Sequence, residues 1–561
     1  MATSDRHWLM QLIQQENVED YSLRYAPRRF RRWSPAIVAS AGLGASAALF
    51  PFAISAALAS QYGSINALIG NLVAVILCIM TGIPIAREVA RHNIDMDLLT
   101  RGAGFGYLGS TLTSLIYATF TLVYFAFEGA IMAQGVTGTF GIPLQVSYVI
   151  VALAVIPLVT FGMSFLTRFQ AWSWPIWLVL LVMPIVAVAT IGHHSISDWL
   201  TFSGMDKDGK ISRAGISASM TSIGLVAASL LSLLAQIGEQ ADYLRFMPDR
   251  DATNDRAYRI WTFMAGPGWA IIFMVSYILG TYVASYTVSF IGAASNEPFQ
   301  NFLYAYDLMV PHWLGLTLAF LLVVVAQAKI NVVNAYSGSL SWSNFFSRVL
   351  HRHYGRFTWL VMQVLIGLAL MEAEIFKEMT ALLAFYSNVA VAWIVAVFAD
   401  LTINREWLGL RPDHIEHKRG LLYRFNPVGF GSMVIASVLS IAAFFGVFGD
   451  FLATYSTFSA ALLALVLAPL FALATQGAFY IKRNAQLDAH SATADGLYAC
   501  TVCSAEFEPP DMLDCPFHKG PICSLCCTVE SHCNEVCKVQ ALPADMSVGT
   551  TPTSFMHDHS G

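Results

Sequence analysis

The stretch AIVASAGLGASAALFPFAISAALAS, residues 36–60, carries no charged side chain, and a second apolar run follows at residues 65–86. Hydrocarbon offers the backbone no hydrogen-bond partner, so an uncharged run of about 20 residues predicts a membrane-spanning helix. An arginine-rich leader precedes the first run, and no small-residue cleavage site leads into a soluble domain. Residues 36–60 are therefore expected to stay in the membrane and not to act as a signal peptide.

Composition extends this expectation to the whole chain. The 561 residues are 56% hydrophobic and 12% charged, with a mean hydropathy of +0.58, whereas soluble domains carry about 25% charged residues. We therefore predict an all-α polytopic membrane protein of about twelve transmembrane helices. The runs lie near residues 36–60, 65–86, 110–136, 146–166, 173–192, 214–238, 262–290, 312–335, 357–376, 379–400, 429–448 and 452–480.

Lysine and arginine predict the orientation, because short basic loops resist translocation and stay in the cytoplasm. Most of the 31 basic residues lie in the leader, in the loops after even-numbered runs and in the tail. Both termini are therefore expected in the cytoplasm. The loops after odd-numbered runs hold only Lys207, Lys210, Arg213 and Lys377. The expected divisions are a leader (1–34), a transmembrane domain (35–482), a cysteine-rich module (483–540) and a disordered tail (541–561).

Ten core helices plus two can form two five-helix repeats, and because five is odd, the second repeat enters the membrane inverted. In such bundles the first helix of each repeat is interrupted near the midplane and offers backbone groups to a ligand. Gly42, Gly44 and Pro51 are candidate breaks in the first helix, and Gly224 and residues 236–240 are candidates in the sixth. Gly44 and Gln236 are the expected ligand contacts. Close helix packing is the alternative reading of the small residues.

Two ionisable side chains lie inside predicted helices, Glu128 in the third and Lys329 in the eighth. A charge at the bilayer centre costs at least about 2.5 kcal/mol, so it is retained for packing or for function. Tyr124 lies one turn before Glu128 on the same helical face. A ring and a carboxylate so placed suit a small planar nitrogen heterocycle, which would stack and donate its N–H groups. The alternative is a structural Glu128–Lys329 ion pair.

Eight of the nine cysteines lie between residues 500 and 537. In reducing cytoplasm such thiols favour metal over disulfides. Cys-x-x-Cys pairs place thiolates about 2.3 Å from a tetrahedral zinc, and eight thiolates could complete two closed, structural sites. An iron–sulfur cluster is the alternative, with His518 or His532 able to substitute. The predicted ligands are Cys500, Cys503, Cys515, Cys523, Cys526, Cys527, Cys533 and Cys537.

Two motifs carry a resemblance to a known family. DYSLRYAP at residues 20–27, followed by RRW at 31–33, and DYLRF at 242–246 are similar to the leader and to the Asp-aromatic-x-Arg-aromatic signature of the nucleobase:cation symporter-1 family. The resemblance covers residues 18–480. It implies a leucine-transporter-like inverted-repeat fold and secondary transport by alternating access. The implied substrates are purines, pyrimidines such as cytosine, hydantoins, allantoin or thiamine-like compounds.

The resemblance also implies site residues. In the family a third-helix Trp-x-x-x-Gln pair stacks on and hydrogen-bonds the ligand, and the matching positions here are Tyr124 and Glu128, which shifts the preference toward donor-rich or cationic ligands. The family's eighth helix carries a Ser-Thr sodium site and then a ligand asparagine. Here that stretch reads Gln-Ala-Lys329, with Asn331 and Asn334 beyond. The Lys329 ammonium would take the place of sodium, so proton coupling or uniport is expected.

The segment KINVVNAYSGSLSWSNFFSR, residues 329–348, is similar to a bacterial branch in which such a membrane module is often joined to a histidine kinase. The residues after 540 are too few for a kinase domain. The main hypothesis is thus a permease of the bacterial inner membrane. The alternative is a ligand sensor or transceptor that signals through the cysteine-rich tail to a separate kinase. Neither an enzyme nor a nucleic-acid partner is expected, since the sequence contains no nucleotide loop, nucleophile elbow or zinc-hydrolase motif.

Overall fold

The structure is a computed structural model that describes residues 21–160, 162–205, 211–212, 215–485, 487–488 and 492–538. The predictions for most of the leader and for the disordered tail (541–561) lie outside the described residues. The same is true of the loop residues Lys207, Lys210 and Arg213.

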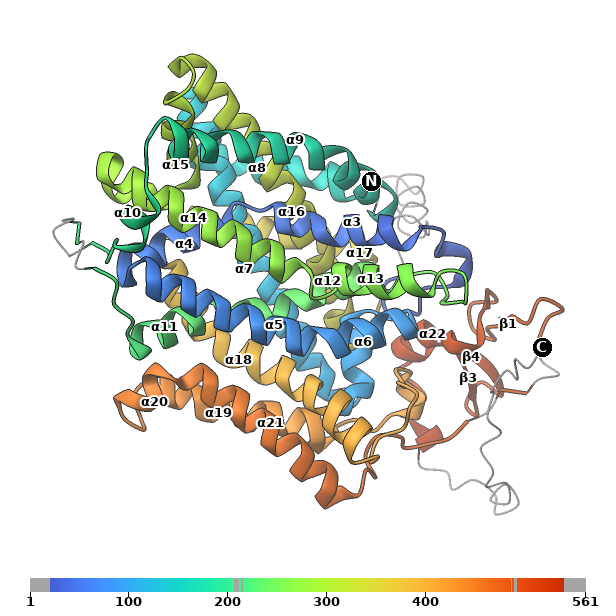
Figure 1. The fold of residues 1–561 in the computed structure, drawn as a ribbon. Coiled ribbons are helices and arrows are strands. Elements are labelled where there is room, and N and C mark those ends of the chain that lie inside the picture. Colours follow the sequence, from blue (N-terminus) through green and yellow to red (C-terminus); the bar gives the residue numbers. More distant parts are fainter. Residues whose placement is uncertain are drawn as a thin grey trace.

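Long helices run alongside one another through most of the molecule (Figure 1). Among the described residues, ten helical stretches are long and apolar enough to cross a membrane. Helices α8 (Leu144–Thr160) and α17 (Arg356–Glu372) are slightly shorter, at 17 residues each. The other long helices are α3 (Pro35–Leu43) with α4 (Phe50–Tyr62), α5 (Ser64–His92), α7 (Gly109–Phe140), α9 (Gly162–Thr190), α11 (Met220–Leu230), α14 (Trp269–Ile291), α16 (His312–Leu350), α18 (Met379–Ala399), α19 (Ser432–Phe444) and α21 (Ser456–Thr475).

Within the described residues each of the twelve apolar runs is largely helical, so the predicted all-α membrane bundle is confirmed. The chain is a multi-pass membrane protein. Its outward surface is apolar as lipid requires: Ile76, Met80 and Ile83 follow one face of α5 and have relative exposures of 47%, 53% and 47%. These side chains are left outside the protein core because acyl chains solvate them as well as other side chains would.

The first membrane helix is interrupted, as the glycines and proline predict. Helix α3 ends at Leu43, a 3₁₀ turn covers Gly44–Ala47, and Ala48 has an extended ψ of 151° before α4 begins. Pro51 lies in the first turn of α4. Proline suits that position because the first N–H groups of a helix have no partner within it. The backbone between the two halves therefore leaves the α-helical hydrogen-bond pattern, and the N–H of Leu49 donates to a side chain instead.

The sixth membrane helix changes from α to 3₁₀ geometry at a place that overlaps the expected residues 236–240 only at Gln236. Between α11 and α12 (Ile237–Leu244), residues Leu231–Gln236 form a 3₁₀ segment. Gly224 lies inside α11, where an added Cβ would be 2.6 Å from the ring of Tyr455. Gly224 therefore serves close packing, which was the alternative reading. Six consecutive residues without glycine or proline make the actual break.

A small cysteine-rich unit lies beyond one end of the bundle, at the right of Figure 1 near α6 (Met96–Thr100). Two antiparallel pairs build it, β1 (Tyr498–Ala499) with β2 (Glu506–Phe507) and β3 (Met512–Cys515) with β4 (Gly520–Cys523). Helix α22 (Ser524–Val529) follows. Its small core includes Tyr498, Met512, Leu513 and Ile522, and packs on Leu421 of the membrane domain. So few apolar side chains are too small a core for independent stability.

Candidate functional site

The two helix interruptions border one cavity inside the bundle. Its volume is about 30 Å³, room for one or two water molecules. Helices α7, α14 and α16 complete its wall. The lining residues are Ala45, Ser46, Ala48, Phe50, Pro51, Tyr124, Glu128, Leu233, Gln236, Trp269, Phe273 and Ile330. A planar heterocycle would need the aromatic rings of this wall to move apart.

Glu128 lies in the wall of this cavity and is 1% exposed. The Gln327 amide donates to the Glu128 carboxylate at 2.5 Å and to the Glu128 carbonyl at 2.9 Å. The same amide's oxygen accepts from the N–H of Leu49, in the first-helix break, at 2.9 Å. Gln327 thus fixes the carboxylate beside the unwound backbone. No basic side chain of the described chain pairs with Glu128, and the N–H of Phe50 also donates to its carboxylate.

Tyr124 is the aromatic neighbour of Glu128 on α7. Its hydroxyl lies 3.2 Å from the Ser232 hydroxyl, in the sixth-helix break. Its ring centroid lies 4.5 Å from that of Phe120 and 5.1 Å from that of Phe50. Tyr124 therefore connects the two breaks, with Phe50 in edge contact where a flat ligand would stack.

Gln236 and Glu239 form a second polar group at the sixth-helix break. The Gln236 amide donates a short hydrogen bond to the Glu239 carboxylate, and Glu239 is fully buried. The other carboxylate oxygen of Glu239 has no hydrogen-bond partner among the described residues. The sequence reasoning named Gln236 but assigned no role to Glu239. A carboxylate at the end of an apolar run was the signal that would have found it.

Lys329 does not pair with Glu128, so the ion-pair alternative is not what the structure shows. Its ammonium donates to the Ser173 hydroxyl at 2.8 Å and to the Gln170 carbonyl at 3.1 Å, both on α9. The ammonium also lies 4.7 Å from the ring centroid of Trp174. Lys329 is fully buried, and neutral acceptors and a ring surround its charge.

Gly44 lets Gln170, the hydrogen-bond partner of Lys329, lie against the first-helix break. A Cβ at Gly44 would lie 2.0 Å from the Gln170 side chain, so only glycine allows α9 to approach so closely. The Gln170 amide in turn donates to the Lys329 carbonyl at 2.8 Å. Gly44 therefore lies beside the cavity and not in its wall, and it aligns α9, α16 and the break.

Asn331 and Asn334 are fully buried on α16 but do not line the cavity, where Ile330 takes that position. Neither amide has a hydrogen-bond partner within the described part of the chain. An unpartnered buried polar group costs about 1–3 kcal/mol, so water, a ligand or another conformation is expected to satisfy these amides. Asn331 lies one turn and Asn334 two turns after Gln327 on α16.

The two motifs that resemble a known family contact each other. Arg245 is fully buried and donates to the Tyr21 carbonyl and to the Tyr336 hydroxyl, both at 3.2 Å. The ring of Phe246 lies 5.5 Å from that of Phe30 and 5.7 Å from that of Trp33. The leader is therefore fixed against the segment that follows the sixth helix.

Four cysteines of the tail form a closed cluster. The sulfur atoms of Cys500, Cys503, Cys523 and Cys526 all lie within 4.8 Å of one another, and all four cysteines are free. The N–H of Cys523 donates to the Cys500 sulfur at 3.3 Å, as thiolate acceptors require. Four thiolates at this spacing fit tetrahedral zinc or an iron–sulfur cluster.

The other four predicted ligands are less tightly placed. Cys515, Cys527, Cys533 and Cys537 do not meet the same mutual spacing within the described residues. The sulfurs of Cys527 and Cys537 lie 3.6 and 4.0 Å from the Cβ position of Gly420, so these thiols face the membrane domain. The second four-thiolate site stays a prediction.

The cysteine-rich unit is docked on the leader. The Arg24 guanidinium pairs with Asp511, with Nε at 2.9 Å, and stacks 3.7 Å from the Phe507 ring centroid. The N–H of Arg28 donates to the Glu508 carboxylate at 2.7 Å. Since Arg24 and Asp511 are both largely buried, this contact excludes water and holds the residues that lead into α3.

A second contact joins the unit to the segment between α18 and α19. Glu535 pairs with Arg419 at 3.2 Å and with Arg424 at 2.7 Å. Burial alone would raise the pKa of Glu535, but the Arg424 hydrogen bond and the neighbouring cations hold this pKa below its usual range. Arg419 also donates to the Cys527 carbonyl at 3.1 Å. The leader and the segment between α18 and α19 thus both contact the cysteine-rich unit.

Neither a protein-family model nor a curated protein matches this sequence. Solved structures do match it. Mhp1, a nucleobase-cation-symport-1 family transporter in a closed conformation with bromovinylhydantoin bound, is 14% identical over 82% of this chain and 99% of its own, with a TM-score of 0.59. Inward-facing Mhp1 is 16% identical over 81% and 93%, with a TM-score of 0.52.

A Na⁺-coupled sialic acid symporter in a substrate-bound, outward-open state is 14% identical over 83% of this chain and 96% of its own, with a TM-score of 0.56. At such identities the likeness concerns the fold. The inverted-repeat fold expected from the helix count and from the family resemblance is therefore confirmed.

Proposed function

We propose that this chain is a secondary transporter that moves a nucleobase-like nitrogen heterocycle across the membrane by alternating access. The observation that carries the proposal is the Glu128 carboxylate, which is buried between two interrupted helices with no cation beside it. Such a group is costly in a membrane unless a ligand uses it. The fold shared with Mhp1, whose structure holds a hydantoin, supports this class of substrate.

The wall of the cavity suits a flat ring with adjacent N–H donors. Tyr124, Phe50 and Trp269 offer aromatic surfaces, and Glu128 and Gln236 offer polar groups on two sides. Stacking would orient the ring, and the carboxylate would accept its N–H groups through charge-assisted hydrogen bonds. Binding is expected to displace the water and to move the Phe50 ring, because about 30 Å³ cannot hold a heterocycle.

Uptake by reconstituted vesicles tests this function. We expect accumulation of a radiolabelled purine, cytosine or hydantoin above that of empty vesicles. A ligand that raises the unfolding temperature of the purified protein but is not accumulated would instead indicate the sensor, which passes its signal to a separate histidine kinase. A compound panel without any binding would contradict both.

We further propose that Lys329 replaces a coupling sodium ion. Its ammonium lies beside the first-helix break, against Gln170 and Ser173 of α9. A fixed positive charge there repels a second cation. An imposed sodium gradient is therefore expected to stimulate vesicle uptake no more than a potassium gradient of equal size does. Strong stimulation by sodium alone would contradict this assignment and leave Lys329 as a packing residue.

We propose zinc as the resident metal of the tail, with Cys500, Cys503, Cys523 and Cys526 as ligands, and the remaining four cysteines as a second set. Zinc thiolate sites commonly fold segments that lack a core of their own. The leader and this unit contact each other, which places both on one side of the membrane. The bias of basic loops supports the cytoplasm as that side, and the family resemblance supports a bacterial inner membrane.

The docked unit suggests a role for the tail within the transport cycle. The leader runs directly into α3, the first half of the interrupted helix. We propose that the metal-bound unit braces this half against the segment at 418–424, and that the cytoplasmic side opens only when the brace yields. The contacts of Arg24 with Asp511 and of Arg419 with Glu535 support the proposal.

A further inference from the structure

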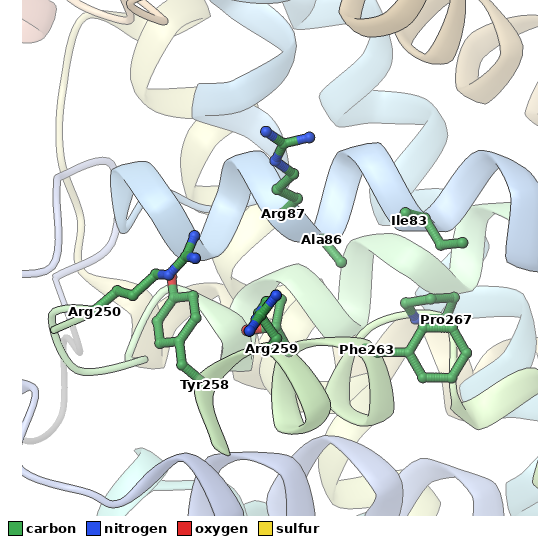
Figure 2. Close-up of a pocket in the computed structure, with 9 residues that line it drawn as sticks. Ile83, Ala86, Arg87, Arg250, Tyr258, Arg259, Phe263 and Pro267 are labelled. Atoms are coloured by element: carbon green, nitrogen blue, oxygen red, sulfur yellow. The ribbon is translucent and has the colours of Figure 1, made fainter. Parts of the chain in front are cut away.

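A groove of about 350 Å³ lies between the end of α5 and α13 (Asp255–Ala265). Figure 2 shows Ile83, Phe263 and Pro267 toward one end, Arg250 toward the other, and Arg259 between them. Arg87 extends from α5 away from α13 in this view. The complete lining is Ile83, Ala86, Arg87, Arg250, Tyr258, Arg259, Thr262, Phe263 and Pro267. The groove shares no lining residue with the cavity at Glu128.

The apolar end of the groove continues the lipid-facing surface of α5. Ile76, Met80 and Ile83 are spaced by one turn on one face and are about half exposed. In the membrane this face lies against acyl chains. Arg87 follows Ile83 by four residues, so the apolar stripe ends at a guanidinium. The sequence of groups along this face matches a lipid, with its tail along α5 and its headgroup at the groove.

The other end of the groove has more positive than negative charge. Arg250 and Arg259 both pair with the one carboxylate of Asp255, at 2.5 and 2.6 Å. Arg87 lies 3.6 Å from Glu406, a loose pair. The side chains of the three arginines are 55–66% exposed. A second anion can therefore approach these guanidinium groups without displacing a buried pair.

The positive charge extends beyond the groove. An adjoining cavity of about 630 Å³ shares Arg87 and Arg250 with it and adds Arg28 and Arg91, together with one carboxylate, Asp249, which pairs with Arg28 at 3.0 Å. Guanidinium groups bind phosphate through paired N–H donors. Basic residues at the cytoplasmic surface of a membrane attract anionic lipids.

We propose that this groove binds an anionic phospholipid, with its phosphate at Arg250 and Arg259 and one acyl chain along the exposed face of α5. The apolar lining selects a lipid over free phosphate, and the excess of arginine selects an anionic over a zwitterionic headgroup. Since α13 leads through Gly266 and Pro267 into α14, the lipid would hold this joint. The site does not depend on which compound the chain transports.

Native mass spectrometry of the full chain in detergent tests the site, with phosphatidylglycerol and phosphatidylcholine of identical acyl chains as probes. The double variant R250Q/R259Q removes the two charges between the helices. The variant D255N removes the competing carboxylate and so acts in the opposite direction. R352Q is the matched control, because Arg352 is an exposed arginine outside the groove. Unfolding temperatures in lipid-free detergent show whether each variant is folded.

The wild type is expected to retain phosphatidylglycerol in preference to phosphatidylcholine. R250Q/R259Q should weaken this binding at least about tenfold, D255N should strengthen it, and R352Q should leave it unchanged. Equal retention of the two lipids would overturn the proposal. So would phosphatidylglycerol binding that is the same in R250Q/R259Q and in D255N as in the wild type. Displacement of the lipid by inorganic phosphate at equal concentration would also overturn it, by showing an ion site in place of a lipid site.

Discussion

Glu128→Gln is expected to weaken the binding of a donor-rich heterocycle by about ten- to hundredfold, the difference between a charged and a neutral acceptor. The substitution keeps the volume of the side chain, and the Gln327 amide can still donate to the new carboxamide oxygen. The fold should therefore persist while the affinity falls. Equilibrium binding of a radiolabelled ligand to purified protein measures the change.

The ligand panel makes the Glu128 prediction specific. Compounds with two adjacent N–H donors should lose more affinity than compounds with one, because the carboxylate offers two acceptor oxygens and the carboxamide offers only one. Glu372→Gln is the control, because Glu372 is an exposed carboxylate at the end of α17. Equal affinities of wild type and Glu128→Gln across the panel would place the ligand elsewhere.

Removal of the tail metal is expected to unfold the cysteine-rich unit and to release the leader. Structural zinc sites contribute on the order of 10 kcal/mol or more of folding free energy, far more than the small apolar core of this unit can supply. The double variant C500S/C523S removes two of four ligands. Elemental analysis should show loss of metal, and hydrogen exchange within residues 21–30 should rise most at the Arg28 N–H, which donates to Glu508.

Two further variants separate the metal from the docking contact. Asp511→Asn leaves every thiol in place but removes the charge that pairs with Arg24, so it should keep the metal and still release the leader. Cys78→Ser changes a buried cysteine of α5 and should neither lose the metal nor release the leader. Failure of C500S/C523S to reach the membrane would show that the tail is needed for insertion, contrary to a brace. Unaltered exchange at residues 21–30 in both tail variants would contradict the docking.

The cysteines show how far spacing alone reaches. The two Cys-x-x-Cys pairs predicted a metal site, and they supply the four sulfurs that the structure brings together. Spacing gave no reason to separate Cys515 or Cys527 from them. That separation depends on the folded unit, in which the Cys527 sulfur lies beside Gly420 of the membrane domain. Which thiols share a metal is thus a property of the folded unit.

Within the membrane the sequence determined what depends on a single segment. The thickness of hydrocarbon sets the length of a span, so the apolar runs predicted the helices, and a charge within a run identified Glu128 and Lys329. Gly44 and Pro51 likewise predicted the first break, because their backbone preferences are local. The 3₁₀ segment Leu231–Gln236 contains neither residue type, and only packing against neighbouring helices decided it.

Tertiary structure alone decided which groups meet. The direction in which a buried side chain points is set by the rotation of its helix against others, and one sequence does not contain that rotation. Lys329 accordingly faces Ser173 and not Glu128, and Gln327 reaches Glu128 across 199 positions of the chain. Arg24 reaches Asp511 across 487 positions. Segment composition fixed the helices and the candidate charges, whereas long-range packing fixed their partners, because contact energies depend on positions in space and not on separation along the chain.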